Sequence, residues 1–202
     1  KTALMRLFSK FLSYLLHPLI IPTIGVLVID TFSSIKIPDE YFYLYMGIVF
    51  FGTYALPSLL VLLLLVLGFV SELEMPHRND RNAPLLLAAI SVYSTERLLE
   101  RLYAPYDILL FLTGISLALI LAFFVNLKIK ASVHIAGMGG LTAGVLALSI
   151  HTQLNLFFVL APIILLTGLL GTARIKLKAH QPSEVYLGFL VGFIPVFGIM
   201  ML

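Results

Sequence analysis

Three short segments, 77–84, 128–137 and 173–184, hold most of the side chains in this chain that could perform chemistry. Each combines Lys or Arg with hydrogen-bonding groups, and the second and third contribute His134 and His180. Guanidinium groups match phosphate oxygens in pairs, and a histidine can act as a nucleophile or as a general acid. The segments therefore predict an anion site, most naturally a site for phosphate.

Glu184 is well placed to orient a histidine. Pro182 suits the first turn of a helix, which puts Glu184 in that turn, where negative charge is favourable, and His180 just before it. The carboxylate could accept a hydrogen bond from one ring nitrogen and leave the other free to attack. Ser132 and the amides that start the following helix would add donors for the anion. The cationic candidates are Arg78, Arg81, Lys130 and Arg174.

The elements that must position these residues are strongly apolar. Hydrophobic residues make up 60% of the 202, charged residues only 11%, and the mean hydropathy is +1.07. A soluble domain carries about 25% charged residues, so the composition excludes an ordinary soluble enzyme, a disordered segment and a DNA-binding domain. We predict an all-α, polytopic membrane bundle that forms one domain over residues 1–202 and has no nucleic acid partner. The chain has no Cys, which excludes disulfides and thiolate metal sites.

A bilayer core needs about 20 helical residues per span, and charged breaks divide the chain into seven apolar segments. The third is expected to be short or partly outside the bilayer, because charged residues occupy its last turns, from Glu96 to Arg101. Residues Lys1 to Lys10 are expected to lie at the membrane surface and lead into the first span. The six to seven predicted spans are Phe11–Val28, Tyr41–Val70 with a kink at Pro57, Pro84–Tyr103, Ile108–Asn126, His134–Ile150, Leu154–Leu170 and Val185–Leu202.

Alternating spans place the three polar segments and the N-terminus on one side of the membrane. That side carries ten of the 13 Lys and Arg residues, and the other side carries three. The positive-inside rule therefore predicts that the candidate site faces the cytoplasm.

The order and spacing of the polar residues resemble the type 2 phosphatidic acid phosphatase (PAP2) superfamily over residues 77–184. The family's third motif, S-R-x5-H-x3-D, is matched by Arg174-x5-His180-x3-Glu184, with Ala for Ser and Glu for Asp. Its second motif, P-S-G-H, is matched by the Ser and His of A-S-V-H at 131–134. The first, K-x6-R-P, is degenerate: Pro84 is present, but the nearest basic residues are Arg78 and Arg81.

The resemblance implies a PAP2-like bundle in a bacterial inner membrane that hydrolyses lipid phosphates without a metal or a cofactor. His180 would be the nucleophile that forms a phosphohistidine, Glu184 would orient it, and His134 would protonate the leaving alkoxide. The partner would be a membrane lipid with a phosphate or diphosphate headgroup, of isoprenyl, phosphatidyl or lipid A type. The phosphate oxygens would be held by Arg174 and Ser132, with Arg78, Arg81 and Lys130 as further candidates.

Two other functions stay open. The degenerate first motif is compatible with a catalytically inactive PAP2-like protein that binds lipid headgroups, or with a structural subunit of a membrane complex or homo-oligomer. A transporter or channel would need ionisable residues in mid-span, and the sequence has very few.

Several residues have simpler structural interpretations. Lys176 and Lys178 are typical of helix ends at a membrane surface. His17, which precedes Pro18, is expected to bond a backbone carbonyl freed by the prolines. His77 and His151 are not site candidates, and close helix packing accounts for the glycines at 137, 139 and 140.

Overall fold

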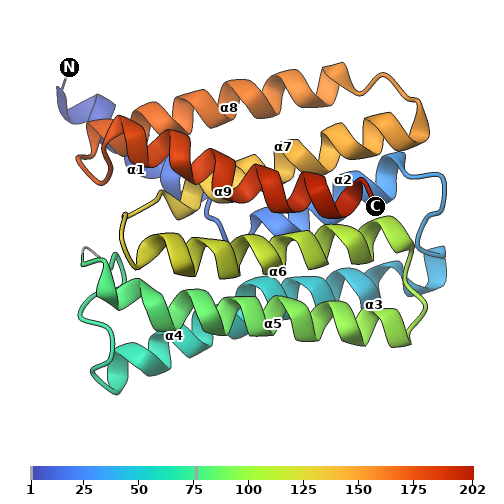
Figure 1. Cartoon of the computed structure of the whole chain (residues 1–202), viewed down its shortest axis with the longest axis horizontal. Coiled ribbons are helices and arrows are strands. Elements are labelled where there is room, and N and C mark those ends of the chain that lie inside the picture. Colours follow the sequence, from blue (N-terminus) through green and yellow to red (C-terminus); the bar gives the residue numbers. More distant parts are fainter. Residues whose placement is uncertain (1, 76) are drawn as a thin grey trace.

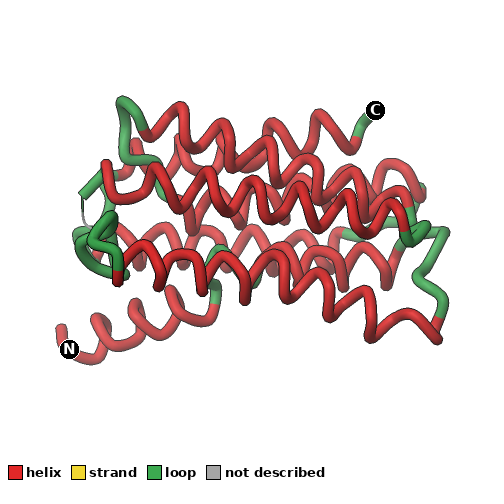
Figure 2. The backbone as a smooth tube through the Cα atoms, turned by 90° about the horizontal axis from the view of Figure 1, so that it is seen from below, coloured by secondary structure: helices red, strands yellow, loops and turns green. Residues whose placement is uncertain are grey.

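A computed structural model describes residues 2–75 and 77–202, so Lys1 of the basic N-terminal segment lies outside the described residues. The described chain is helical with no strand, which confirms the predicted all-α class (Figure 1). Figure 2 shows the helices packed side by side in one bundle. The helices are α1 (Thr2–Leu15), α2 (Ile21–Phe32), α3 (Asp39–Phe50), α4 (Leu56–Val66), α5 (Asn82–Arg101), α6 (Tyr106–Asn126), α7 (Val133–Thr152), α8 (Phe157–Lys176) and α9 (Pro182–Met200).

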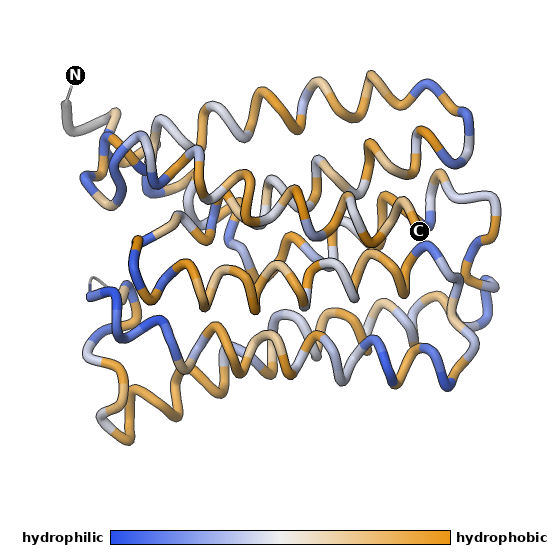
Figure 3. The backbone as a smooth tube through the Cα atoms, viewed as in Figure 1, coloured by the Kyte–Doolittle hydropathy of each residue, from blue (hydrophilic) through white to orange (hydrophobic). Residues whose placement is uncertain are grey.

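Five helical stretches of the described chain are long and apolar enough to cross a membrane. They are the continuous rod Asp39–Val66 and helices α6, α7, α8 and α9. Hydrophilic residues gather near the two ends of the bundle, and apolar residues dominate the middle of the helices (Figure 3). These features indicate an integral membrane protein. The larger count of six to seven spans also requires α5, which has 20 residues, and α2, which has only 12, and it stays a prediction.

The predicted first span, Phe11–Val28, is wrong as a single helix. The chain leaves the helix after Leu15 and begins a second one at Ile21. The break surrounds Pro18, which has no N–H to donate and disfavours helical geometry at the preceding residue. The first helix, α1, is amphipathic and packs against α8, with one buried face that includes Ser9, Leu12 and Ser13. Residues 16–20 form a turn between the two helices, and Pro18 in this turn lies beside Gly137 of α7.

Several other helix ends differ from the prediction. The rod of α3 and α4 ends at Val66 rather than at residue 70. Helix α5 has 20 residues and is not short, but it is not among the five candidate spans, so its expected position partly outside the bilayer stays a prediction. Helix α8 continues to Lys176. Arg174 therefore projects from the last turn of a helix and not from a loop, and the link to α9 shrinks to residues 177–181.

The kink expected at Pro57 takes the form of a π-helical turn, η1 (Phe51–Ala55), which joins α3 to α4. Pro57 cannot donate to the carbonyl four residues earlier, and its ring crowds that carbonyl. A π turn is a common way to absorb such a defect. The Ser91 hydroxyl of α5 donates to the Gly52 carbonyl at 2.5 Å, so one carbonyl of the π turn has a partner on another helix.

Helix α7 lies at the centre of the bundle and is the most buried of the five candidate spans. Its contact with α9 depends on glycine, as the sequence predicts for Gly139, because a Cβ there would overlap the Phe189 carbonyl. A Cβ on Gly188 of α9 would lie 2.6 Å from the Ser132 carbonyl oxygen, and one on Gly192 would overlap the Ala136 carbonyl. This close approach holds the N-terminal turns of α7 and α9 together, and the candidate site lies at those turns.

Candidate functional site

The three polar segments meet at one end of the bundle, the end that also holds the N-terminus of the described chain (Figure 1). The Asn126 amide at the end of α6 donates to the Arg78 carbonyl and to Asn82 Oδ1, both at 2.8 Å. The Ser132 amide donates to the Glu184 carbonyl at 3.1 Å. These bonds connect segments that lie about 50 residues apart in the sequence.

His180 is buried in the short link between α8 and α9, and its Nδ1 has two partners. One is Glu184 Oε2 at 2.9 Å, and the other is the Lys130 carbonyl at 3.2 Å. Both partners are acceptors, so Nδ1 must carry the proton. The lone pair of the neutral ring is then on Nε2, the nitrogen that remains for a reaction.

The first turn of α9 holds Glu184 in place. Pro182 is the first residue of the helix, as the sequence predicts, and Glu184 lies two residues further on. The Gln181 amide donates to Glu184 Oε2 at 3.1 Å, the same oxygen that accepts from His180. Because a backbone amide at the helix N-terminus fixes the carboxylate, the carboxylate can in turn fix the histidine ring.

The surroundings of His180 favour its neutral form. Burial is the largest effect on the pKa of His180 and lowers it; the Glu184 hydrogen bond raises the pKa, and the charges of Arg81 and Arg174 lower it again. The net shift is downward from 6.5, so the ring is uncharged at pH 7. A neutral imidazole among fixed positive charges can act as a nucleophile toward an anion.

Positive charges surround His180. Burial, and then the charge of Arg174, lowers the pKa of Arg81 to about 10, so Arg81 is still protonated at neutral pH. Its Nε donates to the Met75 carbonyl at 3.1 Å. The pKa of Lys130 is also lowered, first by burial and then by the charge of Arg81. These cations repel one another, and Glu184 is an acid near them. A bound anion would stabilise their charged forms.

Among the described residues, two buried side-chain atoms have no hydrogen-bond partner, and both belong to this site. They are Ser132 Oγ and Arg174 Nε. Ser132 is completely inaccessible to solvent. An unsatisfied buried donor costs about 1–3 kcal/mol, so both atoms favour an acceptor at this site. An anion with several oxygens would satisfy both.

His134 lies in the first turn of α7, and its titratable or cationic neighbours are Arg174, His17 and His180. The rings of His17 and His134 meet edge to face, with centroids 5.5 Å apart and planes at 77°. The Nδ1 of His17 accepts from the Leu19 amide at 3.4 Å, so this ring nitrogen does not donate to a carbonyl freed by the prolines. Sequence reasoning missed His17 as a neighbour of the site, and the signal that could have found it is a histidine within an apolar run, directly before a proline.

Arg78 occupies a different position from the other candidates. It precedes the 3-10 turn η2 (Asn79–Arg81), and its carbonyl accepts from Asn126. None of the charges that shift the pKa of His180, Arg81 or Lys130 comes from Arg78. Glu74, which sequence reasoning missed, is the acid whose charge acts on Arg174. The described structure thus brings Arg81, Lys130, Ser132, His134, Arg174, His180 and Glu184 together and leaves Arg78 beside them.

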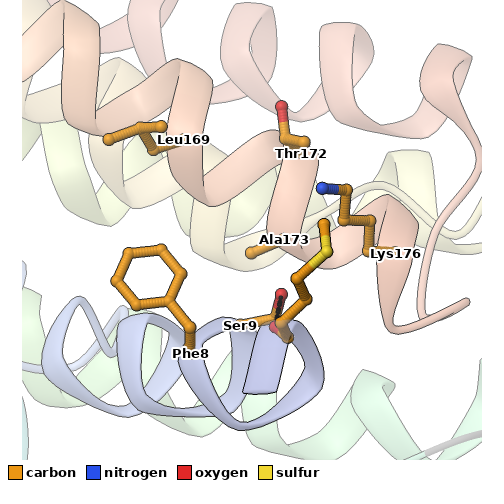
Figure 4. A pocket seen from close by; sticks show the side chains of 7 residues that line it. Phe8, Ser9, Leu169, Thr172, Ala173 and Lys176 are labelled. Atoms are coloured by element: carbon orange, nitrogen blue, oxygen red, sulfur yellow. Dashed lines mark hydrogen bonds between the residues drawn. The ribbon is translucent and has the colours of Figure 1, made fainter. Parts of the chain in front are cut away.

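A groove runs between α1 and α8 at the same end of the bundle. Figure 4 shows Phe8 and Ser9 of α1 opposite Leu169 and Ala173 of α8, with Lys176 at the edge; Thr172 also lines the groove. Its volume is about 430 Å³, and its lining is almost entirely apolar. Among its lining residues, Lys176 is the cation.

No family model, no curated protein and no solved structure matches this chain. Within residues 2–75 and 77–202, no three His, Asp or Glu side chains are grouped so that they could hold a metal ion. The fold and the composition define a class, a helical integral membrane protein, and the buried cationic cluster at one end of the bundle is its distinctive feature.

Proposed function

We propose that this protein is an integral membrane phosphatase that hydrolyses a lipid phosphate or diphosphate through a phosphohistidine at His180. One observation carries the proposal: a neutral, buried histidine shares its cluster with two buried donors, Ser132 Oγ and Arg174 Nε, that have no partner. A phosphate group supplies the electrophilic atom for His180 and acceptor oxygens for Ser132 and Arg174. The PAP2 resemblance predicts the same roles for the same residues.

The reaction has two balanced steps. In the first, the His180 Nε2 lone pair attacks phosphorus, the bond from phosphorus to the lipid oxygen breaks, and His134 protonates the leaving alkoxide. In the second, water attacks the phosphohistidine and gives a proton to His134, the phosphorus–nitrogen bond breaks, and phosphate leaves. Glu184 keeps the proton on Nδ1 throughout. The phosphate oxygens are held by Arg174, Ser132, Arg81 and Lys130.

The apolar groove between α1 and α8 favours a lipid over a water-soluble phosphate. It is open at the helix surface and lies at the same end of the bundle as the cluster, so a hydrocarbon chain could lie in it while the headgroup stays at the cationic end. Lys176 at its edge complements a negatively charged headgroup.

The decisive experiment is phosphate release by purified protein from a panel of lipid phosphates and diphosphates. We expect turnover by the wild type without added metal, inhibition by orthovanadate, and complete loss of activity in His180→Ala. His151→Ala is the matched control, because His151 is exposed at the opposite end of α7. Full activity of His180→Ala would refute the assignment.

Two observations support the alternative of an inactive PAP2-like protein that binds lipid headgroups or serves as a structural subunit. The first motif lacks its Lys, and Arg78 is not among the charges that shift the pKa of His180, Arg81 or Lys130. This alternative predicts no turnover on any lipid phosphate, together with lipid or partner chains that co-purify with the protein.

A further inference from the structure

The break between α1 and α2 places a third histidine, His17, in the site. This turn packs on the first turns of α7, where a Cβ on Gly137 would lie 3.6 Å from Pro18 Cα and 3.5 Å from the Ile21 side chain. Gly137 follows His134 by three residues, about one helical turn, so both face the same neighbour. A helix running straight through residues 16–20 would not make this turn.

The His17 ring is itself fixed. Its Nδ1 accepts from the Leu19 amide at 3.4 Å, inside the same turn, and its ring meets the ring of His134 edge to face. Edge-to-face packing is a preferred arrangement of aromatic rings, because the positive edge of one ring meets the negative face of the other. The turn thus fixes His17, and His17 limits the rotation of His134.

Charged and titratable groups face the His17–His134 pair from several elements. The neighbours of His134 are Arg174 on α8, His180 in the α8–α9 link, and the backbone of Ser13 on α1. Burial, followed by the charge of Arg174, lowers the pKa of His17, so His17 is neutral at pH 7.

We propose that His17 is a positioning residue of the site, and that its ring holds His134 in the orientation needed to protonate the leaving group. This inference rests on the proposed function. It makes the turn between α1 and α2 part of the catalytic apparatus and assigns a role to a residue outside all three PAP2 motifs.

Three substitutions at position 17 separate the ring from the turn. His17→Phe keeps an aromatic ring for His134 but loses the acceptor for the Leu19 amide. His17→Asn keeps an acceptor but loses the ring, and His17→Ala loses both. We expect His17→Ala and His17→Asn to lower kcat by about tenfold to a hundredfold, as for a misplaced catalytic group, with little change in KM. We expect His17→Phe to recover most of that loss.

Unfolding temperatures of all three variants, with His151→Ala as the control, identify any variant that simply fails to fold. Recovery by His17→Asn but not by His17→Phe would overturn the inference, since only the turn would then matter. Wild-type kcat in His17→Ala would overturn it as well.

Orthovanadate affinity distinguishes this inference from the proposed function. We expect weaker vanadate binding in His17→Ala and recovery in His17→Phe. If the wild type binds vanadate but releases no phosphate, hydrolysis is refuted, and the affinities of the Ala and Phe variants still decide the role of His17. Equal vanadate affinity in all variants, or no binding by the wild type, refutes the positioning role.

Discussion

The pairing of His180 with Glu184 fixes one ring nitrogen and leaves the other without a partner from Glu184. Nδ1 donates to a carboxylate oxygen that a helix N-terminal amide also holds, and this leaves Nε2 with its lone pair. Burial and two nearby arginines keep the ring neutral. For the proposed attack on phosphorus, His180 needs both a neutral ring and a fixed ring orientation.

The pH dependence of the rate follows from the lowered pKa of His180. Because the neutral form persists below pH 6.5, we expect kcat/KM to hold through pH 6.5 and to fall as the pH approaches the lowered pKa. Glu184→Gln removes the interaction that raises the pKa, so it should move this acid limb to lower pH and reduce the rate. The free energy of unfolding should decrease as the pH falls from 6.5 toward the lowered pKa. In that interval His180 binds a proton more readily in the unfolded state than in the folded state.

The pH profiles of wild type and Glu184→Gln, measured in the same detergent, test this prediction. An acid limb centred at pH 6.5 in both proteins would contradict it.

Ser132 should behave as a residue that serves function at the expense of stability. Its buried hydroxyl has no partner, so Ser132→Ala removes a penalty of about 1–3 kcal/mol and should leave the unfolding temperature unchanged or higher. The same substitution should reduce phosphate release. Ser91→Ala is the matched control: its hydroxyl is bonded to the Gly52 carbonyl, so its loss should lower stability by about 1 kcal/mol with little effect on the rate. A clear loss of stability in Ser132→Ala would contradict this interpretation.

At the scale of the elements, the site depends on how closely α7 and α9 approach. Glycines at 139, 188 and 192 let the two backbones come nearer than side chains would allow. The Ser132 amide is bonded to the Glu184 carbonyl across this contact. Packing between two apolar helices therefore sets the distance between the second and third polar segments.

Gly188→Ala should damage the site through this contact. The added Cβ would lie 2.6 Å from the Ser132 carbonyl oxygen, which is backbone and cannot move aside, so we expect a destabilisation of about 1–3 kcal/mol and a large loss of activity. Gly198→Ala lies in the same helix with no atom within 4 Å, and there alanine should be neutral or stabilising by up to about 1 kcal/mol. Thermal unfolding and phosphate release of the two variants make the comparison, and equal behaviour would refute the role of the contact.

At the scale of the whole molecule, the bundle has one cationic end and one mixed end. The opposite end of α5 carries the charged group of Glu96, Arg97 and Glu100, in which Arg97 bonds both acids. The excess of basic residues at the candidate site predicts that this end faces the cytoplasm.

Single-cysteine labelling can test this orientation, because the chain has no native Cys. We expect Lys178→Cys, in the exposed link at the site, to be protected from a membrane-impermeant reagent in intact cells and to react after the membrane is opened. His151→Cys, at the opposite end, should react in intact cells. The reverse pattern would place the site on the outer face.

The helical class could be predicted from the sequence, because long apolar runs in a membrane need a backbone whose hydrogen bonds are internal. Most residues of the candidate site could be predicted as well, because Arg174, His180 and Glu184 lie close together in the sequence, around the start of one helix. The first span was predicted wrongly. Hydropathy counts apolar residues and does not detect that Pro18 ends a helix inside an apolar run. Arg78 and Arg81 could not be told apart by sequence, since both are basic and only three residues separate them.

The sequence by itself determined the membrane class, the polar segments and the pairing of His180 with Glu184, since these depend on composition and on contacts within a few residues. Only the tertiary structure decided that Ser132 and Arg174 would be left without partners and that His17 would meet His134. Those features depend on the packing of α1, α7, α8 and α9. Contacts between residues that are far apart in the sequence depend on how the helices pack, and neither composition nor local spacing determines that packing.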